Sequence, residues 1–154
     1  MWQRKQTLFL GLAILCLLMM IFFPVWRAQN EQTIWSLFPL HFTVKEGEQA
    51  VTTYFPYSLS AILAIAAITV AWIEITKFEN RLLQMKLGAL NALLMAGSMG
   101  SAVYFATQLM KANQIAGEYG FAIWLPGIAM VCNMIANRFI RRDEKLVRDS
   151  ERLR

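Results

Sequence analysis

The side chains that could do chemistry are few and stand far apart. His41 is the single histidine, and Glu46 and Glu48 follow it closely enough to form a carboxylate and imidazole group if a turn folds them together. Acid–base catalysis needs such groups within hydrogen-bond reach of one another. A lone histidine in this setting is more often a solvated strand residue, and that is what we expect of His41.

The two cysteines, Cys16 and Cys132, each lie inside a long apolar run. We expect them at opposite depths of antiparallel spans, which excludes a disulfide, and no CxxC-type metal or redox motif is present. Buried cysteines usually behave as small apolar residues. The sequence therefore predicts no catalytic residue, no metal site and no cofactor.

Polar residues near or inside the apolar runs are the remaining candidates. An ionisable residue inside a span is costly and marks ion-coupled transport. Glu74 is the nearest case, with Lys77 within one helical turn, and we expect it to reach toward the headgroups at the membrane interface. The uncharged polar residues should mainly form hydrogen bonds between helices, worth about 1 kcal/mol or less each; they are Asn91, Ser98, Ser101, Thr107, Gln108, Asn133 and Asn137.

The elements that position these residues follow from the composition. Of 154 residues, 57% are hydrophobic and 16% charged, and the mean hydropathy is +0.43, which excludes an ordinary soluble domain. A bilayer core about 30 Å thick needs around 20 apolar residues in a helix. Four stretches meet this test, at residues 8–26, 57–73, 87–110 and 119–140.

The distribution of Lys and Arg predicts the orientation, because basic loops resist translocation. Twelve basic residues lie in residues 1–7, the 74–86 loop and the part from 138 onward, against three on the other side. Both termini are therefore expected in the cytoplasm, with the 27–56 loop outside. The first run is too long for the apolar part of a secretory signal and lacks a good cleavage site, so we expect it to be retained as a span.

The 27–56 loop is the one outer segment long enough to fold. Apolar and polar residues alternate over 40–44, residues 45–49 are typical of a turn, and residues 50–55 are rich in β-branched and aromatic side chains. This pattern predicts a two-stranded hairpin. Because a lone hairpin is marginally stable in water, we expect Trp35, Phe38 and Phe42 to be buried against the helices or a partner.

The C-terminal residues 141–154 continue the fourth span without Gly or Pro, which predicts a helix beyond the membrane. Phe139, Leu146 and Leu153 recur every seven residues, and mixed charges flank this stripe. Such a helix suits a protein groove or a second helix, whereas interleaved acids oppose nucleic acid binding. The alternative is a solvated helix without a partner. The residues expected to dock a partner are Phe139, Arg142, Asp143, Glu144, Lys145, Leu146, Arg148, Arg152, Leu153 and Arg154.

Small residues spaced by four allow transmembrane helices to approach closely. Such rows occur on the second and third spans, which we expect to be close neighbours. A leucine at Gly97 or Gly100 should then destabilise the bundle by about 1 to 3 kcal/mol. The residues expected to pack helices are Ala64, Ala67, Ala71, Ala92, Ala96, Gly97, Gly100 and Ser101.

Three strings of the sequence carry a family resemblance: residues 1–8, residues 77–87 and, above all, residues 140–154. Over its whole length the chain resembles a Bacteroidota family of small four-span integral membrane proteins of the DUF4293 type, a domain of unknown function. Trp2 departs from the aliphatic residue common at that place. The resemblance implies an inner-membrane protein of a Gram-negative cell with a periplasmic hairpin, and it implies no activity, substrate or cofactor.

The predicted fold class is thus an all-α membrane protein: a four-helix transmembrane bundle with a small periplasmic β-hairpin and a cytoplasmic C-terminal helix. For function, the docking surfaces favour a non-enzymatic scaffold, anchor or accessory subunit. It would contact membrane lipids and dock a protein on the cytoplasmic side, with the hairpin as a second docking surface. A small transporter or channel component, or an intramembrane enzyme, would need buried ionisable or catalytic groups, which the apolar runs do not show.

Overall fold

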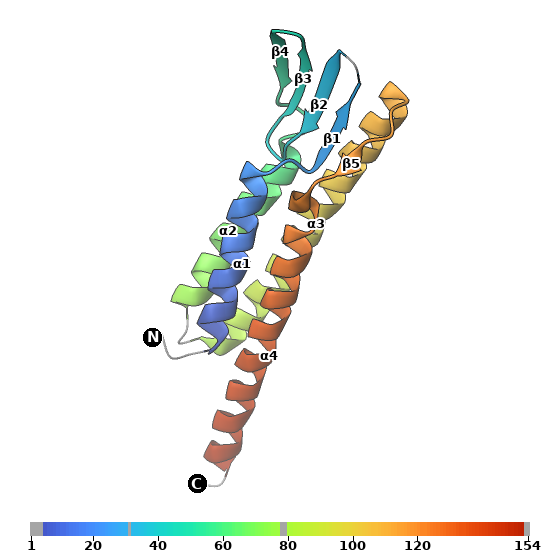
Figure 1. Cartoon of the computed structure of the whole chain (residues 1–154). Helices are drawn as coiled ribbons and strands as arrows, with labels where there is room; N and C mark the ends of the chain where they lie inside the picture. Colours follow the sequence, from blue (N-terminus) through green and yellow to red (C-terminus); the bar gives the residue numbers. More distant parts are fainter. Residues whose placement is uncertain (1–4, 31, 78–79, 153–154) are drawn as a thin grey trace.

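Four long helices lie side by side, and a small sheet covers one end of them (Figure 1). The computed structural model describes residues 5–30, 32–77 and 80–152. The helices are α1 (Lys5–Phe22), α2 (Leu59–Thr76), α3 (Arg81–Asn113) and α4 (Leu125–Arg152). All four are long and apolar enough to cross a membrane. We call the end that carries the sheet the sheet end, and the end where α1 begins and α2 ends the basic end.

The helix bounds differ from the expected spans for local reasons. α1 ends at Phe22 because Pro24 lacks an amide hydrogen and restricts the residue before it, so Trp26 belongs to a strand and not to the first span. α3 begins at Arg81, six residues earlier than expected, because the Asn80 side chain accepts a hydrogen bond of 3.0 Å from the Leu83 amide and caps the helix. The expected 74–86 loop is therefore largely helical.

The fourth span also begins later than expected. Glu118–Tyr119 is a strand, Phe121–Ile123 is a single 3-10 turn, and α4 starts only at Leu125. From there the helix runs without a break to Arg152. The expected C-terminal helix is thus the continuation of α4.

The sheet is larger than the predicted hairpin. Its strands are β1 (Trp26–Gln29), β2 (Thr33–Leu37), β3 (Phe42–Glu46), β4 (Gln49–Thr53) and β5 (Glu118–Tyr119), antiparallel and in the order β4-β3-β2-β1-β5. The predicted hairpin is β3–β4, whose two-residue turn places Gly47 at a φ of +58°. Strands β1, β2 and β5 were not predicted, so the all-α fold class is corrected to a mostly helical fold with a five-stranded sheet.

The apolar interior has two parts. The first lies between the four helices and the second lies under the sheet, where Trp26, Leu37 and Phe42 pack on Phe105 and Leu109 of α3. α3 continues beside the sheet beyond the sheet-end turns of the other helices (Figure 1). Of the hairpin residues expected to be buried, Phe42 is buried, and Trp35 and Phe38 are half-buried.

Candidate functional site at the basic end of the bundle

Glu74 lies near the basic end of α2, and its side chain is 0% exposed. Neither carboxylate oxygen has a hydrogen-bond partner among the residues that the structure describes. The expectation that Glu74 reaches toward the headgroups is therefore wrong. The physical reason is the early start of α3, which brings Gln84 against α2: the Gln84 Nε2 donates a hydrogen bond of 2.7 Å to the Glu74 backbone oxygen.

Other polar side chains are enclosed between this end and the middle of the bundle. Gln84, Gly88 and Asn91 lie at spacings of four and three on one face of α3, and Asn91 is fully buried with neither amide atom partnered. Asn133 of α4 is also fully buried, and its Nδ2 donates to the Gly88 carbonyl oxygen at 2.8 Å. We call the set formed by Glu74, Gln84, Asn91, Asn133 and Asn137 the polar layer.

The polar layer holds six buried oxygens that have no partner in the described part of the chain. They belong to the Glu74 carboxylate and to the four amide side chains. An unsatisfied buried polar group costs about 1 to 3 kcal/mol, so a bundle selected for stability alone would not keep so many. These oxygens make the polar layer the candidate functional site of the bundle.

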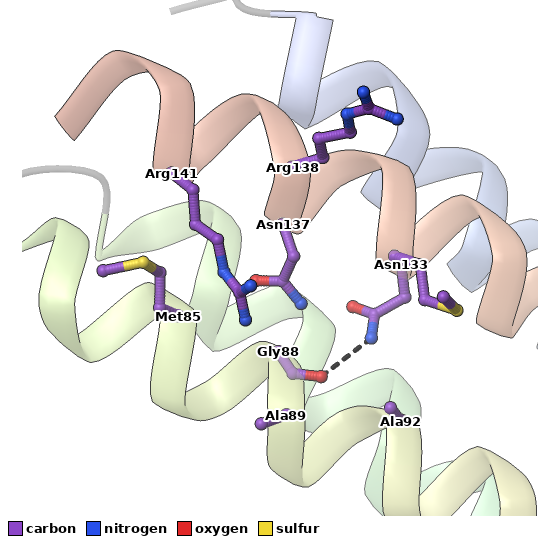
Figure 2. Close-up of a pocket in the computed structure, with 9 residues that line it drawn as sticks. Met85, Gly88, Ala89, Ala92, Asn133, Asn137, Arg138 and Arg141 are labelled. Carbon is purple, nitrogen blue, oxygen red and sulfur yellow. Dashed lines mark hydrogen bonds between the residues drawn. The ribbon is translucent and has the colours of Figure 1, made fainter. Parts of the chain in front are cut away.

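A groove lined by both polar and apolar side chains opens beside this layer, between α3 and α4 (Figure 2). Its cavity is about 470 Å³. The Asn137 amide packs directly on Gly88, because a Cβ at that position would overlap it. Figure 2 shows Asn133, Asn137 and Arg141 directed from α4 toward α3, whereas the Arg138 guanidinium is directed away from α3. The groove is lined by Met85, Gly88, Ala89, Ala92, Asn133, Met134, Asn137, Arg138 and Arg141.

α4 extends past the rest of the bundle at the basic end (Figure 1). Arg81, the first residue of α3, donates to the Asp143 carbonyl oxygen at 2.8 Å and lies 3.9 Å from the Glu144 carboxylate. Residues 143 and 144 are therefore level with the start of α3. Beyond them, Leu146 is 62% exposed. We call residues 145–152 the projecting segment.

Some of the residues expected to dock a partner contact the bundle, whereas others are exposed. Phe139 stacks on Phe9 of α1 with ring centroids 5.8 Å apart, and Asp143 and Glu144 contact Arg81. The apolar stripe predicted from Phe139 is therefore split, because its first member packs inside the bundle. Arg142, Lys145 and Leu146 are exposed. The side chains of Arg148 and Arg152, and residues Leu153 and Arg154, lie outside the described part.

The residues expected to pack helices also differ in their surroundings. Ala64, Ala67 and Ala71 of α2 are fully buried, and α2 packs against α3 along its length. A Cβ at Gly97 would lie 3.4 Å from Leu63 Cδ1, whereas one at Gly100 would meet nothing within 4 Å. Gly100 is thus not a packing residue. Ala92 and Ser101 are half-buried and Ala96 is exposed.

His41 sits between two rings rather than beside acids. Its ring stacks on Phe38 at 4.9 Å and is tilted against Tyr54 at 5.8 Å, so it is half-buried and not a solvated strand residue. Glu46 and Glu48 lie at the opposite end of the β3–β4 hairpin. The structure therefore does not assemble the carboxylate and imidazole group.

Cys16 and Cys132 are free thiols in the same helical core cluster. Each lies seven residues toward the sheet end from the stacked Phe9 and Phe139, which puts both at one level of the bundle. The expectation of opposite depths is wrong. The described residues contain no group of three His, Cys, Asp or Glu side chains that could hold a metal ion.

The polar residues of the bundle can be identified in the sequence, but their contacts with one another cannot. Gln84, Gly88 and Asn91 are spaced by about one helical turn, and Asn133 and Asn137 are four residues apart. Their convergence depends on which faces of α3 and α4 meet, and the apolar runs do not specify this.

Comparison with curated proteins finds no match. The model of the family described as "Domain of unknown function (DUF4293)" matches residues 2–153. The match spans nearly the whole chain, in agreement with the resemblance of its start, its central connection and its C-terminal string. The chain therefore belongs to the DUF4293 family.

Proposed function

We propose that this protein is a non-enzymatic integral membrane protein that acts as a scaffold, anchor or accessory subunit. In this proposal the projecting segment of α4 docks a cytoplasmic protein. The observation that carries it is the 62% exposure of Leu146 on a helix that has left the bundle. A helix needed only to cross the membrane would end near Glu144, where the contacts with Arg81 end.

The proposal places the four helices across the inner membrane of a Gram-negative cell, with both termini in the cytoplasm. The excess of twelve basic residues over three supports this orientation. Single cysteines at Gln49 and Ser150 test it with an impermeant thiol reagent. In intact spheroplasts Gln49→Cys should label and Ser150→Cys should not; the reverse result would contradict the orientation.

The expected partner is a cytoplasmic protein that offers an apolar helix face flanked by acidic residues. Residues 145–154 contain four basic and two acidic side chains, so acids on the partner would complement them. Apolar contact with Leu146 supplies buried area, and rim charges of this kind mainly set register and association rate.

A photocrosslinking residue at position 146 tests this docking directly. Leu93 on α3, which is 72% exposed on the helical surface, is the matched control position. We expect a discrete adduct with an acidic cytoplasmic protein from position 146 only, lost in the variant Arg148→Glu plus Arg152→Glu and in Leu146→Asp plus Leu153→Asp. Identical adducts from both positions, or adducts between copies of this chain alone, would contradict the proposal.

A second function, as a small transporter or channel component, is favoured by one observation. Glu74 is a fully buried carboxylate with no partner among the described residues, and such groups often carry ions or protons in transporters. Proton or sodium flux into liposomes that contain the purified protein tests it. Flux through the wild type that Glu74→Gln abolishes and Glu48→Gln leaves unchanged would favour this second function. Equal leakage through the wild type and both variants would exclude it.

A further inference from the structure

We propose that the groove between α3 and α4 binds the headgroup of an anionic phospholipid that carries hydroxyl groups, with phosphatidylglycerol as its ligand. The Arg141 guanidinium would bind the phosphate, and the amide oxygens of Asn133 and Asn137 would accept hydrogen bonds from the glycerol hydroxyls. This inference rests on the proposed membrane placement and is independent of the docking role of the projecting segment.

The position of the groove favours a lipid. Asn133, Asn137 and Arg141 precede Asp143 by ten, six and two residues, so with a rise of about 1.5 Å per residue they lie roughly 15, 9 and 3 Å inside the basic end of the bundle. The surface around the groove is apolar: Met134 and Val131 on α4 and Leu93 on α3 are exposed. A groove that opens sideways into an apolar surface faces lipid, where little water can satisfy the polar groups among its lining residues.

The donors and acceptors of the groove define the ligand further. The Asn133 Nδ2 is already used by the Gly88 carbonyl oxygen, which leaves the Asn133 Oδ1 as a buried acceptor without a partner. The Asn137 Oδ1 is likewise a buried acceptor with no partner among the described residues. A ligand that satisfies these two buried acceptors must donate hydrogen bonds. A choline headgroup has no such donor, whereas a glycerol headgroup has two hydroxyls.

The charge of the groove favours an anion. Two arginines and no acid are among its lining residues, and the one ion pair between described residues is that of Arg81 with Glu144, outside the groove. Guanidinium and phosphate form short, charge-assisted hydrogen bonds. Arg141 is directed toward α3 and Arg138 away from it (Figure 2), so Arg141 is the expected phosphate ligand.

Arg142 provides a matched control. It is exposed, carries the same charge and neighbours Arg141 in sequence, but it does not line the groove. General attraction to anionic lipid would treat the two arginines alike, because each basic residue near an anionic leaflet contributes similarly. A specific phosphate site in the groove should depend on Arg141 and not on Arg142.

The test measures which lipid the purified full chain retains in native mass spectrometry. Phosphatidylglycerol and phosphatidylcholine with the same acyl chains are supplied in equimolar amounts. The wild type should retain the glycerol lipid in preference to the choline lipid. Arg141→Gln should lower this retention about tenfold, the effect of losing one charge-assisted contact, and Arg142→Gln should leave it within about twofold. Equal losses in both variants, or no preference in the wild type, would overturn the site.

Two further arms keep the result decisive. Asn137→Asp keeps the side-chain size but adds a negative charge beside the phosphate, and it should also lower retention; unchanged retention in Asn137→Asp counts against the geometry. Excess inorganic phosphate should not displace the lipid, because the lipid adds hydroxyl and acyl contacts that free phosphate lacks. Displacement by phosphate would assign the groove to a soluble anion instead. Labelling of Gln49→Cys in spheroplasts reports separately whether the membrane placement holds.

Discussion

The two ends of the bundle differ in how many of their buried polar groups have hydrogen-bond partners. At the sheet end the strands pair in register, the Gly120 amide donates to the Val25 carbonyl oxygen at 2.7 Å, and the Val25 amide donates to the Leu37 carbonyl oxygen at 2.7 Å. Of the described side chains there, two ring nitrogens, Trp26 Nε1 and His41 Nδ1, are buried without a partner. From the basic end to the middle of the bundle, six side-chain oxygens of the described residues are buried without a partner.

The surroundings of these groups also differ between the two ends. The sheet end buries a tryptophan and several apolar residues against α3, and its backbone hydrogen bonds are closed by neighbouring strands. The basic end encloses an acid and four amides whose complement is not supplied by the described residues. We infer that the sheet end holds the fold together and that the basic end is kept polar for what it binds.

The largest effect should come from the sheet end. Trp26 is fully buried at the centre of the cluster under the sheet, and Trp26→Ala should lower the free energy of unfolding by about 3 to 5 kcal/mol. Thermal unfolding in detergent measures it. Phe55→Ala is the control, because the Phe55 side chain is 83% exposed; similar losses in both variants would break the distinction between buried and exposed rings at this end.

A smaller loss should follow from Gly120→Ala. A Cβ at Gly120 would overlap the Pro24 carbonyl oxygen, a backbone atom that cannot move without disturbing the junction of α1 with β1. We expect a loss of about 1 to 3 kcal/mol from overpacking, measured by the same unfolding experiment. Gly11→Ala is the matched control, since a Cβ there would meet nothing within 4 Å, and a control as damaging as Gly120→Ala would contradict this reading.

The smallest effect is expected at Gly100. Because its added Cβ would meet open space, Gly100→Ala should change stability only through helix propensity, a gain of up to about 1 kcal/mol. An unfolding midpoint that falls by several degrees would show that Gly100 packs against a neighbour after all. That result would restore the row of small residues on α3 as a packing surface.

The helical part of the fold could be predicted because the length and polarity of a span are local properties. The β3–β4 hairpin was also predictable from alternation around Gly47. Strands β1 and β2 were missed because each has five residues or fewer, and β5 has only two and pairs with β1 across most of the chain. Such pairing depends on tertiary contacts that no local pattern encodes.

The candidate site was predictable in its residues and not in its assembly. Asn91, Asn133 and Asn137 could be recognised as polar residues within apolar runs, with hydrogen bonding between helices as their expected use. Asn133 follows this expectation through the Gly88 carbonyl oxygen. The burial of Glu74 was missed because it depends on the start of α3 at Arg81, which the Asn80 cap determines.

Replacement of Glu74 by leucine tests the central claim most directly. Leucine has a similar size and removes two buried oxygens that have no partner. If the basic end is kept polar at the expense of stability, Glu74→Leu should raise the free energy of unfolding by about 1 to 3 kcal/mol, while Glu48→Leu on the exposed hairpin turn should change it little. A midpoint for Glu74→Leu that falls below that of the wild type would show that the carboxylate stabilises the bundle, and would contradict the account.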